Sequence, residues 1–230
     1  SDAQSNSWKL LVCSTSADPT ASTTTPTCAG GDGNKYCVSS GWVAANAQNT
    51  CTRTAVIEDA TSNTWYAFAC DNFTGDPRCS SSSQGAGDTG SPFYTNHEPV
   101  TGLHTSDAGT APGKNVGQTI TFSMAFTDSN SDTAKIHVCK TNVISGETCT
   151  GGSWCDGSTY STTPNTCTKT ALIGDGTSNA YYVFACDEHG FCDSTSVSGT
   201  FYTNHEPVTG SSTSDAGTAP GKNVGQTITF

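Results

Sequence analysis

The sequence predicts an all-β protein made of tandem antiparallel β-sandwiches that are rich in disulfide bonds. Three observations support this fold class. The 230 residues include 39 Thr, 29 Ser and 24 Gly, a composition that favours strands and turns over helices. The 12 Cys form an even set without C-x-x-C spacing, which is typical of disulfides rather than metal clusters. Apolar residues alternate in short runs, and no run has the 3.6-residue period of an amphipathic helix.

The overall charge and polarity exclude two classes of partner. The formal net charge is −11 with only nine scattered Lys and Arg, so we expect no nucleic-acid binding. No apolar run approaches the roughly 18 residues of a membrane span, so we expect no membrane insertion. The cysteine content instead predicts a secreted protein, located extracellularly or at a cell surface.

The chain repeats itself with an offset of 108 residues. Residues 93–122 recur as residues 201–230 with only two differences. A period of this length is typical of an all-β sandwich module. We therefore expect a first module at residues 1–96 that lacks its own first strands, a complete second module at residues 97–204, and a C-terminal donor segment at residues 205–230.

The second module can be interpreted as a series of short strands. Residues 116–128 alternate cleanly, with Ile120, Phe122, Met124 and Phe126 on one face. Such alternation is the signal of a half-buried strand. Further strands are expected around Ile136 and Val138 and at residues 169–173, 181–186 and 199–202, separated by turn residues.

Two local patterns resemble a known family. Asp175 followed by Tyr182-x-Phe184-x-Cys186 resembles the penultimate strand of immunoglobulin-like domains, where a corner Tyr precedes a Cys. The pattern NHEPV at residues 96–100 resembles the openings of Ig-like, PKD-like and cadherin-like repeats in microbial secreted surface or filament proteins. The resemblance covers most of each module and implies immunoglobulin-like sandwiches. It implies no single function, because many unrelated proteins use such modules.

The modules are out of phase with the chain. The first module lacks a counterpart of the apolar strand at residues 116–128, while residues 205–230 repeat the opening of a module. A sandwich without a central strand exposes apolar side chains and unpaired backbone groups. We therefore expect head-to-tail donor-strand complementation, a heterologous contact that produces an open homopolymer. The expected donor residues are Val224, Ile228 and Phe230, and the expected acceptor residues are Leu10, Val12, Tyr66 and Phe68.

Two alternatives stay open. The sequence can be a window of a longer tandem-repeat polypeptide, although joining Phe230 directly to Ser1 would make the connection to the next Cys four residues shorter than in the internal copy. The protein can also be a cell-surface adhesin or stalk that binds glycans or another cell. The aromatic residues that could stack on sugars are Trp42, Trp154, Tyr36 and Tyr160.

The cysteine spacing favours sequential disulfides. The gap of 19 residues between the fourth and fifth Cys is the same in both modules, whereas the first and last gaps vary, as expected of loops with joined ends. Each short loop would contribute about 3 kcal/mol in the loop-entropy model. The alternative joins Cys13 to Cys70 across neighbouring strands. The favoured pairs are Cys13–Cys28, Cys37–Cys51, Cys70–Cys79, Cys139–Cys149, Cys155–Cys167 and Cys186–Cys192.

No sequence motif points to catalysis, and the ligand signals are weak. G-x-S-x-G, H-E-x-x-H and P-loop patterns do not occur, so we expect no enzyme activity. Asp128, Asn130 and Asp132 are spaced like the start of a calcium loop, but the Gly and bidentate Glu are missing. A polar turn is therefore favoured over a calcium site, and no other cofactor is expected.

The sequence also contains one candidate glycosylation site, Asn72-Phe73-Thr74.

Overall fold

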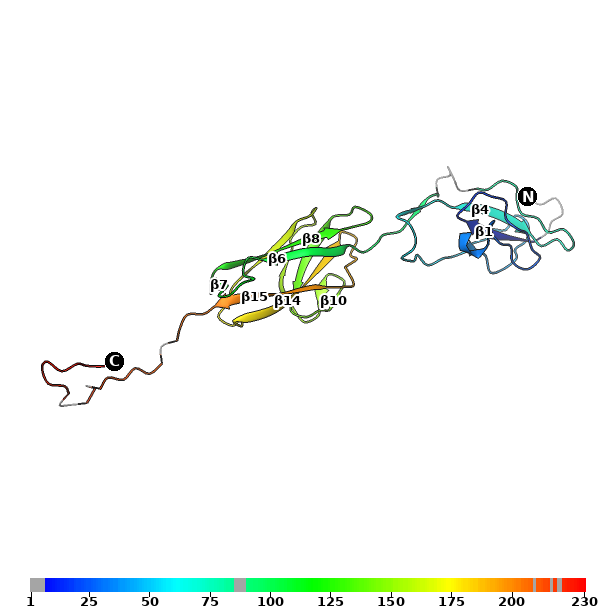
Figure 1. Ribbon diagram of the computed structural model, residues 1–230. Helices are drawn as coiled ribbons and strands as arrows, with labels where there is room; N and C mark the ends of the chain where they lie inside the picture. Colours follow the sequence, from blue (N-terminus) through cyan, green and yellow to red (C-terminus); the bar gives the residue numbers. More distant parts are fainter. Residues whose placement is uncertain (1–6, 85–89, 209, 216, 219–220) are drawn as a thin grey trace. The chain divides into compact units, whose positions relative to one another are not determined.

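The chain forms two compact units of β-structure. In the computed structural model these are Ser1–His97 (unit 1) and Glu98–Phe230 (unit 2). The described residues form strands and one short 3-10 turn, with no α-helix (Figure 1). No described segment forms a helix long and apolar enough to cross a membrane. The structure describes residues 7–84, 90–208, 210–215, 217–218 and 221–230.

Unit 2 contains two larger sheets and a small hairpin. The order of the first sheet is β12-β9-β14-β15-β7, and that of the second is β13-β8-β6. All pairs are antiparallel except β15 with β7. The hairpin consists of β10 and β11. The strands are β6 (Val100–Ser106), β7 (Lys114–Asn115), β8 (Thr119–Thr127), β9 (Ala134–Cys139), β10 (Ile144–Ser145), β11 (Thr148–Cys149), β12 (Ser153–Asp156), β13 (Asn165–Thr170), β14 (Ser178–Asp187) and β15 (Val197–Asn204).

The core of unit 2 is formed by side chains of both larger sheets. Ile120, Phe122 and Met124 of β8 are completely buried, because every second residue of this strand faces inward. Ile136 and Val138 of β9 belong to the same cluster. Each such side chain contributes roughly 1.5–3 kcal/mol when it is fully buried. The side chains of β8 therefore exclude water from the inner face of β9 and β14.

Aromatic rings connect the two sheets of unit 2. The ring of Phe122 makes edge-to-face contacts with Tyr181 at 5.0 Å and with Phe201 at 5.5 Å. Trp154 packs edge-on against Phe201 at 4.9 Å. The Nζ atom of Lys169 lies 4.7 Å from the centre of the Trp154 ring, at the edge of this cluster. Phe122 is thus the residue through which β8 engages the aromatic part of the core.

Unit 1 has strands that match β9, β12 and β14 but no second large sheet. Cys13 lies opposite Tyr66 as Cys139 lies opposite Tyr182, so the central pair has the same register. Among residues 7–84 and 90–97 no strand corresponds to β6, β7 or β8, and residues 49–54, the counterpart of β13, are not in a strand. The elements are β1 (Trp8–Cys13), η1 (Asp32–Asn34), β2 (Lys35–Val38), β3 (Ser62–Asn63), β4 (Tyr66–Asp71) and β5 (Phe93–Tyr94). The sheets are β2-β1-β4 and β3-β5.

Six disulfides join all the cysteines in sequential order, which is the pairing that the gap lengths favoured. The bonds are Cys13–Cys28, Cys37–Cys51, Cys70–Cys79, Cys139–Cys149, Cys155–Cys167 and Cys186–Cys192. No free cysteine is left. Six disulfides in a chain of this size indicate an oxidising environment.

The observed strands differ from the expected ones, since β13 is displaced and β6, β7, β10, β11 and β12 were not expected. β13 ends before residues 171–173, because Asp175 Oδ2 accepts the backbone N–H of Leu172 at 2.9 Å and closes a turn there. β6 was not expected, since its sequence does not alternate. Its Gly102 allows a bulge against β8, where an added Cβ would lie 3.2 Å from the Ala125 carbonyl oxygen.

Candidate functional site

One face of the β1–β4 pair in unit 1 is apolar and open. Leu10 lies opposite Ala69 and Val12 opposite Ala67, so these four side chains share one face of the sheet. None of the four is buried. The alternate residues of both strands, such as Leu11 and Phe68, point to the other face, where all but the partly buried Tyr66 are buried.

The matching face of unit 2 is completely covered. Ile136, Val138, Val183 and Ala185 occupy the same positions in the repeat and are all buried. They belong to one cluster with the apolar side chains of β8. The described residues of unit 1 contain no strand equivalent to β8, and this accounts for the difference in exposure.

The open face forms a groove of about 550 Å³, which we call the acceptor groove. Nine of its ten lining residues occupy positions whose unit 2 counterparts belong to or pack against the unit 2 core. The tenth, Arg53, corresponds to Lys169 at the edge of that core. The acceptor groove therefore corresponds, residue by residue, to the part of the unit 2 core that packs against β8. The lining residues are Leu10, Val12, Tyr36, Cys37, Cys51, Arg53, Ala55, Trp65, Ala67 and Phe93.

A second hollow, of about 630 Å³, borders the same sheet at the start of β1. Trp8 and Ala69 line it, together with the Cys70–Cys79 disulfide and the loop at residues 45–48. Trp8 lies opposite Asp71 and shares the face of Leu10. The uncovered face thus extends over the whole of β1.

The expected acceptor residues divide between the two faces of the sheet. Leu10 and Val12 line the groove, as expected. Tyr66 and Phe68 do not, because they lie on the opposite face, where Phe68 is buried against the Cys13–Cys28 disulfide. These two acceptor assignments are corrected: strand alternation directs the residues between them, not Tyr66 and Phe68, to the groove.

Two aromatic residues of the groove escaped the sequence analysis. Trp65 and Phe93 line the groove, and they correspond in the repeat to Tyr181 and Phe201. A residue-by-residue comparison of the two copies could have found them, since Tyr181 and Phe201 fall at inward positions of their strands. Whether Tyr181 and Phe201 lie on the same face depends on the register of β14 against β15, and the sequence does not show this register.

The C-terminal segment carries a turn that forms without a surrounding module. The Thr229 N–H donates to Asp215 Oδ1 at 3.1 Å, and the Asp215 N–H donates to the Thr229 carbonyl at 3.2 Å. Lys222 Nζ lies 2.9 Å from Asp215 Oδ2, and the Gln226 N–H donates to the Asn223 carbonyl. The identical residues of unit 2 make the same contacts within residues 107–121. Hydrogen bonds within the segment therefore hold the turn.

The apolar side chains of this segment are exposed. Phe230 is 92% exposed and Ile228 is 46% exposed, and Val224 is completely exposed. Their identical counterparts Phe122 and Ile120 are completely buried in unit 2. The described residues of the segment form no strand in Figure 1, whereas the corresponding residues of unit 2, which differ at two positions, form β6, β7 and the first part of β8. The expected donor residues thus lack a partner surface within the described part of the chain.

Three carboxylates meet at the β8–β9 turn. Oxygen atoms of Asp128, Asp132 and Asp187 all lie within 4.8 Å of one another. Asp128 Oδ1 accepts the backbone N–H groups of Asn130 at 2.7 Å and Asp132 at 3.1 Å, which is the polar turn favoured by the sequence. The Oδ2 atoms of Asp128 and Asp132 are buried and accept no hydrogen bond from the described residues. These oxygens could hold a divalent cation such as calcium.

Asp132 provides a test of this weak calcium prediction. Burial, followed by the charge of Asp128, raises the pKa of Asp132, while His189 opposes the rise. The stability contribution of a carboxyl with a raised folded-state pKa is present at low pH and lost as pH increases through that pKa. At pH 7 in EDTA we therefore expect Asp132→Asn to raise the melting temperature, with a smaller gain near pH 4.

Calcium should raise the melting temperature of the unchanged chain but not of Asp132→Asn. Differential scanning calorimetry with and without calcium measures both effects. The exposed Asp18 provides the matched control, and Asp18→Asn should change neither curve. Identical curves for the unchanged chain in calcium and in EDTA would remove the calcium assignment.

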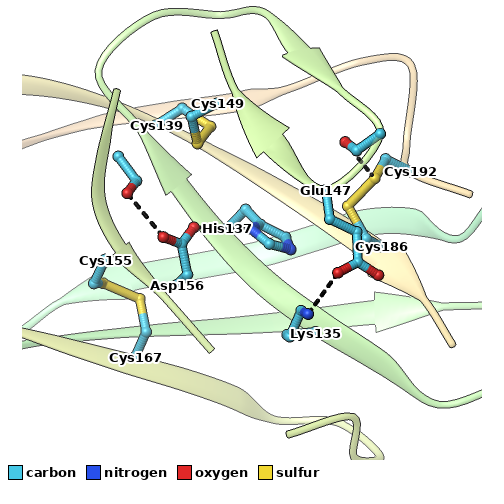
Figure 2. Close-up of polar contacts among 12 residues, drawn as sticks. Lys135, His137, Cys139, Glu147, Cys149, Cys155, Asp156, Cys167, Cys186 and Cys192 are labelled. Carbon is cyan, nitrogen blue, oxygen red and sulfur yellow. Dashed lines mark hydrogen bonds and ion pairs between the residues drawn. A yellow bond between two sulfur atoms is a disulfide. The ribbon is translucent and has the colours of Figure 1, made fainter. Parts of the chain in front are cut away.

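Figure 2 shows a second polar group, on the face of β9 that points away from the core. Lys135 Nζ donates to Glu147 Oε2 at 2.6 Å. The Tyr160 hydroxyl donates to the other Glu147 oxygen. The hydrogen bonds from Lys135 and then Tyr160 hold the pKa of Glu147 below its usual range. This interaction stabilises the fold above the usual carboxyl pKa and is lost as the pH falls.

The same face carries Ser153, His137 and Asp156, but not in a catalytic arrangement. His137 Nδ1 lies 2.8 Å from Asp156 Oδ1, and Ser153 Oγ donates to Asp156 Oδ2 at 2.8 Å (Figure 2). The Nε2 atom of His137 is buried and has no hydrogen-bond partner among the described residues. A serine nucleophile needs the histidine as its base, and here the Ser153 hydroxyl donates to the Asp156 carboxylate and not to His137.

The aromatic residues considered for sugar stacking are engaged in cation–π contacts. Lys140 lies 4.6 Å from the centre of the Trp154 ring, and Lys169 lies 4.7 Å from it. Arg53 lies 4.9 Å from the Tyr36 ring. The remaining two are contacted in the same way, Trp42 by Lys9 and Tyr160 by Lys135. All four rings therefore take part in packing.

The glycosylation candidate lies in a surface turn. Asn72 follows β4, and its backbone N–H donates to the Ser7 carbonyl at 3.3 Å. Phe73 and Thr74 beside it are exposed. Such a turn suits an N-linked glycan, and modification of Asn72 stays a prediction.

The fold and the groove define a disulfide-rich all-β protein with one covered and one uncovered β-unit. Comparisons with protein-family models, curated proteins and solved structures give no match to this chain. The functional argument therefore depends on the geometry of the chain itself.

Proposed function

We propose that this chain is a structural subunit of an extracellular filament that polymerises head-to-tail by donor-strand complementation. One observation carries the proposal: the acceptor groove is lined by the counterparts of unit 2 core residues that pack with β8, and residues 205–230 repeat the sequence that precedes and begins β8 with two differences. In the polymer, unit 1 and unit 2 would both be immunoglobulin-like sandwiches. Unit 1 would be completed by a second copy of the chain.

The energetics favour filling the groove. Phe230 and Ile228 are exposed on the segment, and Leu10, Val12 and Phe93 are incompletely buried on unit 1. Each large apolar side chain gains roughly 1.5–3 kcal/mol on burial, so a few of them supply a substantial association energy. The hydrogen bonds between Asp215 and Thr229 are already formed, which reduces the ordering cost of binding.

The geometry of the contact favours a filament over a closed dimer. The groove belongs to unit 1 and the donor segment to the other end of the sequence, so the two surfaces differ. A contact between unlike surfaces is heterologous, and repeating it produces an open chain unless the rotation closes a ring. The disulfides suit a secreted polymer, because they persist in oxidising compartments.

The glycan-binding alternative has less support. The four candidate aromatic rings are held by cations of the same chain. A window of a longer repeat polypeptide differs from the subunit proposal only in the source of the donor segment. In that case the same sequence would reach the groove through a covalent connection.

Deletion of residues 205–230 tests the proposed function. The unchanged chain should form filaments in electron micrographs, and the deletion variant should remain monomeric in light scattering. Val143→Asp is the matched control, since Val143 is an exposed apolar residue of unit 2 outside the donor segment. This variant should still form filaments.

A synthetic peptide of residues 205–230 separates the remaining possibilities. It should bind the deletion variant and raise the melting temperature of unit 1. Filaments that survive the deletion would refute the proposal. Peptide binding by an unchanged chain that never polymerises would instead indicate a groove that is filled within a longer polypeptide.

A further inference from the structure

Residues 51–55 border the acceptor groove and carry backbone groups that no described residue pairs. Cys51, Arg53 and Ala55 line the groove. Residues 51–55 make no backbone hydrogen bond to any described residue. The Cys37–Cys51 disulfide ties this segment to β2. It is therefore fixed in place beside the groove without being part of a sheet.

The counterpart of this segment in unit 2 is a paired strand. β13 has the sequence NTCTKT, compared with NTCTRT at residues 49–54. All six residues of β13 are opposite residues of β8, with Thr168 facing Thr121 and Thr170 facing Thr119. The pairing continues beyond the strand, where the Ala171 N–H donates to the Gln118 carbonyl at 2.8 Å. The same sequence is thus a strand where β8 is present and coil where it is absent.

We propose that the donated segment pairs with residues 51–55 and turns them into a strand, in the register of β8 on β13. This inference rests on the proposed function and adds its register. Thr229 then lies opposite Thr52, and Thr227 lies opposite Thr54. The outer edge of β4 is already taken, since Ala67 exchanges backbone hydrogen bonds with Gln84.

The register places the donor side chains on matching partners. Phe230 takes the position of Phe122, which contacts Tyr181 and Phe201 in unit 2. In unit 1 these contacts pass to Trp65 and Phe93, both of which line the groove. The aromatic contact that joins the sheets of unit 2 is thereby rebuilt between two chains.

Other registers lose this fit. A slip by one residue would turn the apolar face of the donor away from the groove, because side chains alternate along a strand. A slip by two residues keeps the face but moves Phe230 by two positions along the groove, away from Trp65 and Phe93. The backbone hydrogen bonds alone permit either slip, so the aromatic contacts select the register.

Paired cysteine substitutions test the register in the full chain. Residues directly opposite in a sheet have Cα atoms about 4.5–5.5 Å apart, which suits a disulfide, whereas diagonal neighbours lie about 7–8 Å apart. Thr52→Cys with Thr229→Cys, and Thr54→Cys with Thr227→Cys, are the matched pairs. Thr54→Cys with Thr229→Cys is the mismatched control. All four positions lie on the polar face of the expected strand pair, so apolar packing is preserved.

Mild oxidation of assembled filaments should produce ladders of cross-linked chains in denaturing gels. The matched pairs should cross-link at least ten times more than the mismatched pair. Equal or stronger cross-linking of the mismatched pair would overturn the register while filaments would still support the proposed function. Absence of filaments from the unchanged chain would count against the proposed function itself.

A second measurement covers variants that do not assemble. A peptide of residues 205–230 with Thr229→Cys is oxidised with the full chain carrying Thr52→Cys or Thr54→Cys. The register predicts that the peptide links to the Thr52→Cys chain. Preferential linkage to Thr54→Cys, or to neither chain despite binding of the peptide, would contradict it.

Discussion

Phe230→Ala should weaken assembly by about 10²–10⁴-fold and leave the melting temperature of unit 2 unchanged. Loss of a buried Phe side chain costs about 3–5 kcal/mol, and each 1.4 kcal/mol is a factor of ten in affinity. Phe230 is 92% exposed in the single chain, so its removal costs that chain little. The whole penalty should therefore appear in the association equilibrium.

The same substitution in the other copy supplies the matched control. Phe122 has identical flanking residues through the preceding turn and is completely buried in unit 2. Phe122→Ala should lower the stability of unit 2 by about 3–5 kcal/mol. Sedimentation or light scattering across a concentration series measures assembly, and calorimetry measures unfolding. An unchanged critical concentration for Phe230→Ala would show that the donor side chain does not enter a groove.

The sequence predicted the class of fold because the relevant signals are local. The alternation of apolar and polar residues at 116–128 indicates a half-buried strand without reference to any distant residue. The observed strand β8 lies within that range. The spacing of the cysteines is likewise a local signal, because each disulfide closes a short loop between consecutive cysteines. β6 and the short strands of the cysteine-rich region carry no alternation, and tertiary pairing decides them.

The candidate site was predicted only in part, for a physical reason. The repeat shows that no described residue of unit 1 corresponds to β8, but the face of β4 that such a strand would cover depends on strand register. Leu10 and Val12 lie on the open face, as expected, because β1 matches β9 closely, whereas Tyr66 and Phe68 lie one residue out of phase, on the other face. A shift by one residue exchanges the faces of a strand.

The two units allow nearly identical segments to be compared with and without a neighbouring β8. Residues 49–54 and β13 differ only by Arg and Lys at one position, yet one is coil and the other a strand. Local propensity is nearly the same in the two segments. The presence of β8 therefore accounts for the difference, and strand formation here is a tertiary effect.

This reasoning predicts that unit 1 becomes much more stable when it receives its own strand. A copy of residues 97–133 placed directly before Trp8 would recreate the connection that leads from β8 into β9. It would cover Leu10, Val12 and Phe93, each worth roughly 1.5–3 kcal/mol when fully buried. For a unit of this size, about 1 kcal/mol corresponds to roughly 4–8 °C, so the melting temperature of unit 1 should increase by about 20 °C or more.

The same variant should no longer polymerise, because the attached strand competes for the groove at a high effective concentration. Calorimetry and light scattering on one preparation measure both effects. The matched control carries Ile120→Asp and Phe122→Asp within the added copy, and it should show neither the increase in melting temperature nor the block of assembly. If the added copy without these two substitutions left the melting temperature of unit 1 unchanged, unit 1 would not need a further strand. Its open face would then have another purpose than binding a donated strand.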